Sequence, residues 1–185
     1  MLLPFLLIGM GAAQERQGRP IHPPVIRLPR LGITRIPSPD QKWTLIFEMA
    51  NWESTRKLWI QKKTSNERKL VRDFERSLDI SWSPDSSHFF VNDASGSSET
   101  NCYVYDPETL DAIDVTRLLG ANSKIVRSFE ADHFYVEATR WVNSSELLIT
   151  LTGYLSSTPP KPGLDGAYRV NLNGSVRTLR EGYFR

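Results

Sequence analysis

Cysteine is almost absent from this chain of 185 residues, which holds only Cys102. A single cysteine excludes an intrachain disulfide and lacks the companions that a structural zinc site requires. We therefore expect Cys102 to be a small buried apolar residue. An excess of one charge is also lacking, because 23 Lys and Arg residues face 21 Asp and Glu residues, for a net charge of +2. This balance gives no sign of a nucleic-acid partner.

The short motifs of catalysis and phosphate binding are missing as well. The chain has no Gly-x-Ser-x-Gly, no Gly-x-Gly-x-x-Gly and no P-loop. Its richest ionisable cluster, FEADHFYVE, holds Glu130, Asp132, His133 and Glu137, but alternation along a strand sends neighbouring side chains to opposite faces. We predict no catalytic residue, no cofactor and no metal site, and so no enzyme.

A hydrophobic run long enough for a stable membrane span is lacking. The apolar run MLLPFLLIGMGAA, Met1 to Ala13, would extend about 20 Å as a helix, against a hydrocarbon core of about 30 Å. It carries no charged side chain and ends in Gly11, Ala12 and Ala13, as a signal-peptide core with its cleavage site does, although no Lys or Arg precedes it. We predict export to the periplasm or the extracellular space, with a mature chain that begins near Gln14.

Residues 14–40 differ in composition from the rest of the chain. They hold six of the twelve prolines and five arginines, against one Glu and one Asp. Proline removes backbone donors and favours extended geometry, so no helix is expected here. Two interpretations stay open: a disordered linker, or an arm that lies along the body with VIRL, Val25 to Leu28, pairing at a sheet edge.

After Asp40 the sequence has the pattern of many short strands. Six segments are rich in β-branched and aromatic residues and are bounded by Asn, Asp, Ser, Gly or Pro: Trp43 to Met49, Lys57 to Gln61, His88 to Asp93, Asn101 to Asp106, Phe134 to Val142 and Leu147 to Leu155. A helical period is found in Glu67 to Arg76 and in Glu108 to Leu119, both weakly capped. The predicted class is all-β.

A repeat organises these strands. SPDQKWTLIF begins at Ser38 and SPDSSHFFVN at Ser83, a spacing of 45 residues, and each holds a Ser-Pro-Asp turn of type I before an aromatic-led strand. A degenerate third copy, WVNSSELLIT, puts Trp141 in the place of Trp82. KLWIQ, CYVYD and AYRVN then supply third strands, and RKLV, AIDVTRLL and SVRTL fourth strands. Three four-stranded antiparallel units are predicted, with Trp82 and Trp141 filling the space between neighbouring sheets.

The second unit, ISWSPDSSHFFVNDASGSSETNCYVYDPETLDAIDVTRLL, resembles the TolB-like, WD-repeat-like β-propeller repeat. The resemblance covers about residues 33–182, and departs from the family pattern in lacking Gly after either Ser-Pro-Asp and in losing that tripeptide from the third copy. It implies a partial β-propeller of about three four-stranded blades with an extended N-terminal arm. The predicted divisions are a signal peptide at 1–13, an arm or linker at 14–40, and a propeller-like repeat domain at 41–185.

Three units are too few to close a propeller, since about four to eight blades are usual. The chain would then pair with a second copy as a homodimer, dock on another protein's open edge, or be part of a longer parent. The loops between second and third strands should share one face that binds a protein partner: Met49 to Arg56, Ala94 to Thr100 and Thr152 to Gly166, joined by the connections Arg72 to Ser77 and Ala121 to His133. Trp52 and Tyr154 are the predicted partner-binding residues.

The predicted function is an exported, non-catalytic module for protein interaction. Two alternatives stay open. One is a regulatory fragment of an exported hydrolase that contains a propeller, and the other is a degenerate, truncated propeller without a partner.

Overall fold

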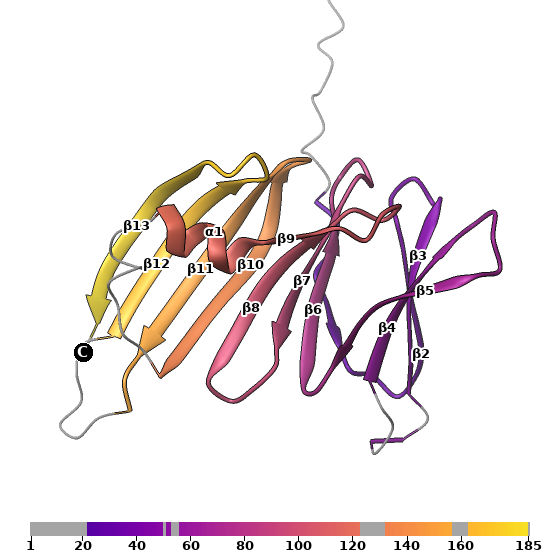
Figure 1. The fold of residues 1–185 in the computed structure, drawn as a ribbon, viewed down its shortest axis with the longest axis horizontal. Helices are drawn as coiled ribbons and strands as arrows, with labels where there is room; N and C mark the ends of the chain where they lie inside the picture. Colours follow the sequence, from indigo (N-terminus) through magenta and orange to yellow (C-terminus); the bar gives the residue numbers. More distant parts are fainter. Residues whose placement is uncertain (1–21, 50, 53–55, 123–131, 157–162, 185) are drawn as a thin grey trace, which may run out of the picture.

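A computed structural model describes residues 22–49, 51–52, 56–122, 132–156 and 163–184 (Figure 1). The predicted signal peptide, residues 1–13, and the predicted start of the mature chain near Gln14 lie outside these residues. The described chain is built of short strands with one short helix, so the all-β class is confirmed.

Three four-stranded units follow one another along the chain. Unit 1 is the antiparallel sheet of β2 (Gly32–Pro37), β3 (Trp43–Met49), β4 (Arg56–Lys62) and β5 (Arg68–Phe74). Unit 2 consists of β6 (Ser77–Trp82), β7 (Phe89–Ala94), β8 (Glu99–Tyr105) and β9 (Ala112–Asp114). Unit 3 consists of β10 (His133–Asn143), β11 (Glu146–Tyr154), β12 (Gly163–Asn171) and β13 (Val176–Phe184). The units lie side by side along the long axis of the molecule (Figure 1).

The two Ser-Pro-Asp turns have the same geometry, which explains why they recur. In each turn the serine Oγ donates to the aspartate Oδ1 at 2.7 Å, in Ser38–Asp40 and in Ser83–Asp85. The amides of Gln41 and Ser86 close the turns on the serine carbonyls at 2.9 and 3.0 Å, as predicted for type I. Gln41 and Ser86 have φ values of 60° and 68°. Glycine adopts this left-handed conformation most easily, and neither position holds one.

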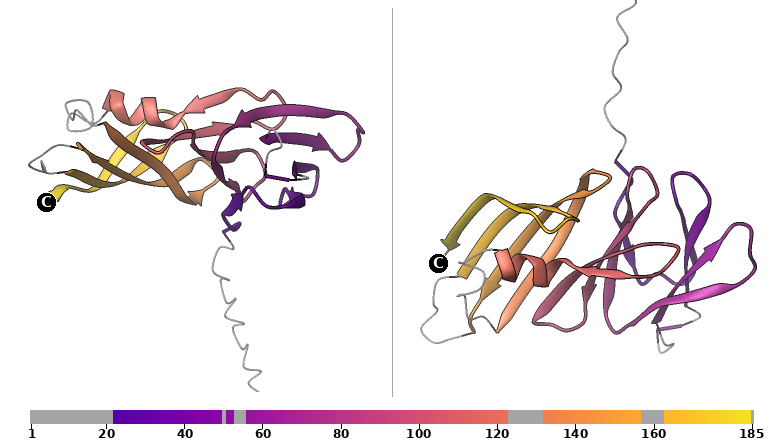
Figure 2. Two further views of the ribbon diagram at one scale, coloured as in Figure 1. Left: turned by 90° about the horizontal axis from the view of Figure 1, so that it is seen from below. Right: turned by 45° about the horizontal axis from the view of Figure 1, so that its top comes forward.

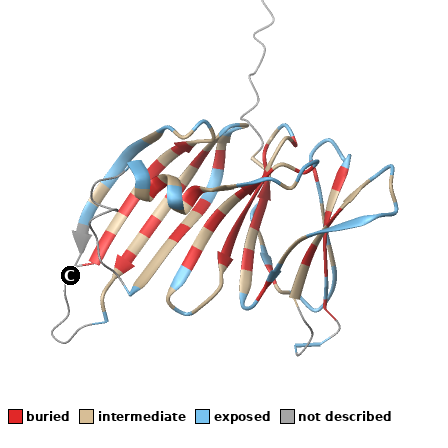
Figure 3. Cartoon of the chain, in the orientation of Figure 1, coloured by how far each residue is buried: buried red, intermediate tan, exposed pale blue. Residues whose placement is uncertain are grey.

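Unit 2 lies between the other two units. Residues Phe89 to Asp93 of β7 are all buried, because alternate side chains of this strand face different cores. Phe89 and Val91 join the core shared with unit 1, whereas Phe90 joins the core shared with unit 3. Figure 3 shows the nearly continuous burial of β7 and the alternating burial of β11 and β12. A strand buried on both faces is what a middle blade requires.

Three side chains join neighbouring units. The indole Nε1 of Trp82 donates to the carbonyl of Ile36 at 3.1 Å, and Nε1 of Trp141 donates to the carbonyl of Ser81 at 3.2 Å. Both rings are nearly fully buried. Trp82 lies between two sheets as predicted, whereas Trp141 lies between units 2 and 3, which belong to one nine-stranded sheet. Asn92 forms two hydrogen bonds with Ala138. The Asn92 Nδ2 donates to the Ala138 carbonyl at 2.9 Å, and the Asn92 Oδ1 accepts from the Ala138 N–H at 2.8 Å.

The described part of the arm lies along the body. Strand β1 (Ile26–Leu28) pairs antiparallel with β6 through Ile80, Asp79 and Leu78, as the edge-pairing interpretation of VIRL predicted. Leu28 is fully buried, and Arg27 holds Asp79 through two hydrogen bonds of 2.7 and 2.6 Å. Residues 32–37, also within the predicted arm, form the first strand of unit 1.

The helical pattern of Glu67 to Arg76 was misleading, because this segment contains β5. A bulge explains the error: Leu58 pairs with Arg72 and Trp59 with Leu70, so Val71 is an extra residue in the strand. The extra residue breaks the period of two that marks a strand. In Glu108 to Leu119 the prediction is right only in part, since helix α1 (Val115–Asn122) follows β9 and begins at a cap in which Asp114 Oδ1 accepts from the amide of Arg117 at 2.8 Å.

Units 2 and 3 also touch edge to edge. Strand β10 runs parallel to β8 where Phe134 pairs with Glu99 and Tyr135 with Thr100. Helix α1 covers one face of unit 3 in each view (Figure 2), and its Val115 and Leu119 belong to the core of that unit. The fold is a partial β-propeller of three four-stranded units with an extended N-terminal arm, as predicted.

Candidate functional site

The loops predicted to share a face begin on one edge of the molecule. Strands β3, β7 and β11 end along the lower edge in Figure 1, at Met49, Ala94 and Tyr154. We call this side the lower edge. The two Ser-Pro-Asp turns lie at the opposite ends of the strands, along the upper edge (Figure 1). Residues 50, 53–55, 123–131 and 157–162 of the predicted loops and connections lie outside the described residues.

The two predicted partner-binding residues have different surroundings. Trp52 has an exposed fraction of 59%, which is high for a side chain that is largely buried in most proteins. Tyr154 is half-buried and forms a cross-strand pair with His133. The imidazole and the phenol stack with ring centres 4.4 Å apart and planes 8° apart. Tyr135 lies beside them, 6.2 Å from the Tyr154 ring.

This group, His133, Tyr135 and Tyr154, is held in place by polar contacts. The Tyr135 hydroxyl donates to the carbonyl of Ser97 at 2.7 Å, which links β10 to the β7–β8 loop. A hydrogen bond with Tyr154 is the main cause that raises the pKa of Tyr135. Sequence reasoning selected Tyr154 but missed its two neighbours, since the register of β10 on β11 decides which rings meet.

Two sets of Ser, His and Asp residues come together, and neither has the geometry of a catalytic triad. A triad needs the histidine between the other two residues, with each ring nitrogen serving one of them. At the lower edge, Asp132 Oδ1 and Ser156 Oγ both contact Nδ1 of His133, at 3.0 and 3.1 Å.

The second set lies at the upper edge. There Ser87 stands between its partners, because its Oγ donates to Asp85 Oδ1 and contacts Nδ1 of His88, each at 2.8 Å. These contacts join residues that are adjacent or two apart in the chain, so they stabilise the local turn.

Metal binding and cysteine chemistry were also considered for the described part of the chain. There, no three His, Cys, Asp or Glu side chains converge to hold a metal ion. Cys102 is fully buried, as predicted, and its burial raises the pKa of the thiol to about 12. The thiolate form that makes cysteine reactive is therefore disfavoured. Within the same residues, no helix has the length and apolar character needed to cross a membrane.

A largely buried ion pair, Arg72 with Asp93, joins units 1 and 2. Arg72 Nη2 lies 2.5 Å from Asp93 Oδ2, Arg72 Nη1 donates to the Tyr105 hydroxyl at 3.1 Å, and the guanidinium lies 4.6 Å from the Tyr103 ring centre. Burial raises the pKa of Asp93, and the charge of Arg72 opposes that shift. We interpret this cluster as a structural link, since Arg72 of unit 1 contacts Asp93, Tyr103 and Tyr105, which all belong to unit 2.

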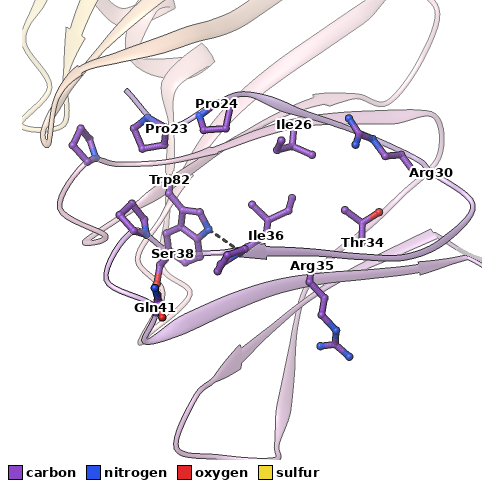
Figure 4. Close-up of a pocket in the computed structure, with 13 residues that line it drawn as sticks. Pro23, Pro24, Ile26, Arg30, Thr34, Arg35, Ile36, Ser38, Gln41 and Trp82 are labelled. Carbon is purple, nitrogen blue, oxygen red and sulfur yellow. Dashed lines mark hydrogen bonds between the residues drawn. The ribbon is translucent and has the colours of Figure 1, made fainter. Parts of the chain in front are cut away.

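An apolar groove, which sequence reasoning missed, lies between the arm and unit 1. It has a volume of about 670 Å³ and is lined by residues of the arm, of β2 and of both Ser-Pro-Asp turns. Figure 4 shows Ile26 of β1 facing Ile36 and Thr34 of β2 across the groove, with Trp82 toward one end and Arg30 at the other. Five prolines contribute to its walls: Pro23, Pro24, Pro37, Pro39 and Pro84.

The comparisons with known proteins show a likeness to solved structures but not to any family model. No family model matches the chain, and no curated protein matches its sequence. The chain is similar to the crystal structure of TolB from Acinetobacter baumannii, with 16% sequence identity and a TM-score of 0.41. The likeness covers 80% of this chain and 32% of that one, so the chain spans about a third of the length of that structure.

Proposed function

We propose that this chain is an exported, non-catalytic propeller-type module that binds a protein partner through its lower edge. The observation that carries the proposal is the exposed indole of Trp52, which follows β3 on the edge where β11 ends at the stacked Tyr154. Trp and Tyr dominate the energetics of protein interfaces because they bury a large area at a small cost in side-chain entropy. The packing of Tyr154 on His133 reduces that cost further.

Substitution of the two anchors tests this proposal. With a partner captured from the exported fraction of the native host, Trp52→Ala and Tyr154→Ala should each weaken binding by about 1–2 kcal/mol. Leu179→Ala is a matched control, because Leu179 is an exposed apolar residue, 46% exposed, on β13. The proposal fails if both anchor variants bind as tightly as the parent while changes in the Ser-Pro-Asp turns abolish binding.

We propose a second copy of the chain as the alternative partner. In unit 1, Arg35, Ile46, Trp59 and Leu70 are paired across the four strands, so their side chains share one face. This face is opposite to Leu45 and Leu58, which join the core shared with unit 2. Ile33, two residues before Arg35, lies on the same outer face, and Ile33 and Leu70 are 62% and 41% exposed.

A homodimer that covers this face would extend the propeller. Light scattering of the purified chain tests it, with Leu70→Lys as the variant expected to convert a dimer to a monomer. A monomer at all concentrations would contradict this pairing and leave the lower-edge proposal standing.

Export itself rests on the apolar N-terminal run. N-terminal sequencing of the protein from its native host should give a chain that begins near Gln14. An intact Met1 on a cytoplasmic protein would contradict export.

A further inference from the structure

We infer that the groove between β1 and β2 is a second binding site, for an extended apolar peptide segment that carries a carboxylate at one end. The site is separate from the lower-edge anchors Trp52 and Tyr154, neither of which lines it. The inference rests on the lining of the groove, its charge and the strands beside it.

The lining is mostly apolar and stiff. Ile26 and Ile36 face each other across the groove (Figure 4), and the five prolines lie along its walls. Proline has a fixed φ, so a wall made of prolines loses little conformational entropy when a ligand binds. The indole of Trp82 is held by its hydrogen bond to the Ile36 carbonyl. The groove is therefore formed before any ligand arrives.

The charge of the groove has one sign. Its thirteen lining residues include two arginines, Arg30 and Arg35, and no Asp or Glu. Neither arginine forms an ion pair with another residue that the structure describes. Arg30 stands at the end of the groove, whereas the Arg35 side chain points away from it (Figure 4). Charge complementarity thus places an anionic group of the ligand at the Arg30 end.

The strands beside the groove favour a peptide over a compact molecule. Strand β1 ends the sheet that contains units 2 and 3, and β2 ends the sheet of unit 1. A terminal strand has backbone N–H and C=O groups on its outer edge that an extended chain can match. We therefore assign an extended peptide as the occupant.

A nuclear magnetic resonance titration of the full chain tests this site. The probe is the synthetic peptide acetyl-Pro-Val-Ile-Val-Asp with a free C-terminus, and the reporters are the indole N–H signals of Trp82 and Trp141. The peptide should shift the Trp82 signal in a saturable way and leave Trp141, which donates to Ser81 in the next interface, unchanged. The same peptide ending in an amidated Asn should bind about fivefold more weakly, as expected for the loss of an exposed ion pair.

Two variants make the charge argument specific. Arg30→Gln should bind the acidic peptide and its amidated form with equal affinity. Arg177→Gln, which changes an exposed arginine of β13 far along the chain, should retain the parent's fivefold preference.

The inference is overturned if the acidic peptide leaves the Trp82 signal unchanged at millimolar concentration, or if Arg30→Gln keeps the preference for the carboxylate. It is also overturned if the chain without peptide is a dimer whose formation Thr34→Glu abolishes, since a second copy would then occupy the groove. Loss of lower-edge binding in Trp52→Ala would not change any of these results, so the two sites are tested independently.

Discussion

The indole N–H of Trp82 donates to the carbonyl oxygen of Ile36 at 3.1 Å, across the interface between units 2 and 1. The corresponding residue of unit 3, Trp141, makes the same kind of bond to Ser81 at 3.2 Å. Ile36 lies two residues before Ser38, and Ser81 lies two residues before Ser83. Ser38 and Ser83 are the first residues of the two Ser-Pro-Asp turns. A tryptophan that donates a hydrogen bond to the preceding unit is thus a repeated contact between units of this fold.

Removal of the Trp82 side chain should destabilise the protein strongly. The ring is 2% exposed and packs on Phe89, with ring centres 5.0 Å apart. We expect Trp82→Ala to lower the free energy of unfolding by about 3–5 kcal/mol, measured by urea denaturation. Trp82→Phe keeps an aromatic ring but loses the bond to Ile36, so it should lie between the parent and Trp82→Ala. A loss below about 1 kcal/mol for the alanine variant would contradict the packing described.

Asn92 should contribute strongly to the free energy of unfolding. Its side chain satisfies both the N–H and the C=O of Ala138 inside the interface of units 2 and 3. Asn92→Ala leaves both buried backbone groups without this partner, and we expect a loss of roughly 2–4 kcal/mol in the free energy of unfolding. Asn143→Ala is the matched control, because Asn143 is an exposed turn residue on β10. Equal losses in the two variants would show that the contact with Ala138 is unimportant.

Glycine at the left-handed turn positions should stabilise unit 1 more than unit 2. Gln41 has a φ of 60°. This conformation is sterically unfavourable for L-residues but not for glycine. We expect Gln41→Gly to raise the free energy of unfolding by up to about 1 kcal/mol. Ser86→Gly relieves the same strain but removes the Oγ that accepts from the amide of Asp40 at 2.9 Å, so its gain should be smaller or absent. Thermal denaturation of both variants distinguishes these results.

The Ser38–Asp40 bond predicts a specific dependence of stability on pH. A hydrogen bond from Ser38 is the main cause that lowers the pKa of Asp40 to about 2, against about 3.9 in an unfolded chain. A carboxyl whose pKa is lowered by folding stabilises the protein above the unfolded value and loses that contribution as pH falls through the folded value. Stability from Asp40 should therefore be complete above about pH 4 and disappear toward about pH 2.

Asp40→Asn tests this dependence, because the amide keeps the shape of the turn and cannot titrate. The difference in free energy of unfolding between parent and variant should shrink as pH falls from about 5 to about 2. Asp85→Asn should behave alike, since burial acts to raise the pKa of Asp85 but hydrogen bonds from Ser83 and Ser87 outweigh it. Parallel stability curves for parent and variant would refute the assignment.

Much of the fold could be predicted from the sequence by local rules. The Ser-Pro-Asp turns, the period of two in β3 and β11, and the matching positions of Trp82 and Trp141 all follow from neighbouring residues. These features are local because a turn is fixed by the φ preferences and side-chain bonds of a few consecutive residues. The choice of Trp52 and Tyr154 as partner-binding residues remains a prediction.

Only the tertiary structure decided which distant residues meet. The pairing of β5 with β4 decides that Val71 is the bulged residue. The stack of Tyr154 on His133 depends on the register of β10 on β11. The groove requires the arm to fold back on β6 while β2 joins another sheet. Sequence alone determined the strands, the turns and the repeat, because these depend on nearest neighbours. The three-dimensional arrangement determined the groove and the aromatic group, because both are made of residues that pairing and packing bring together from separate units.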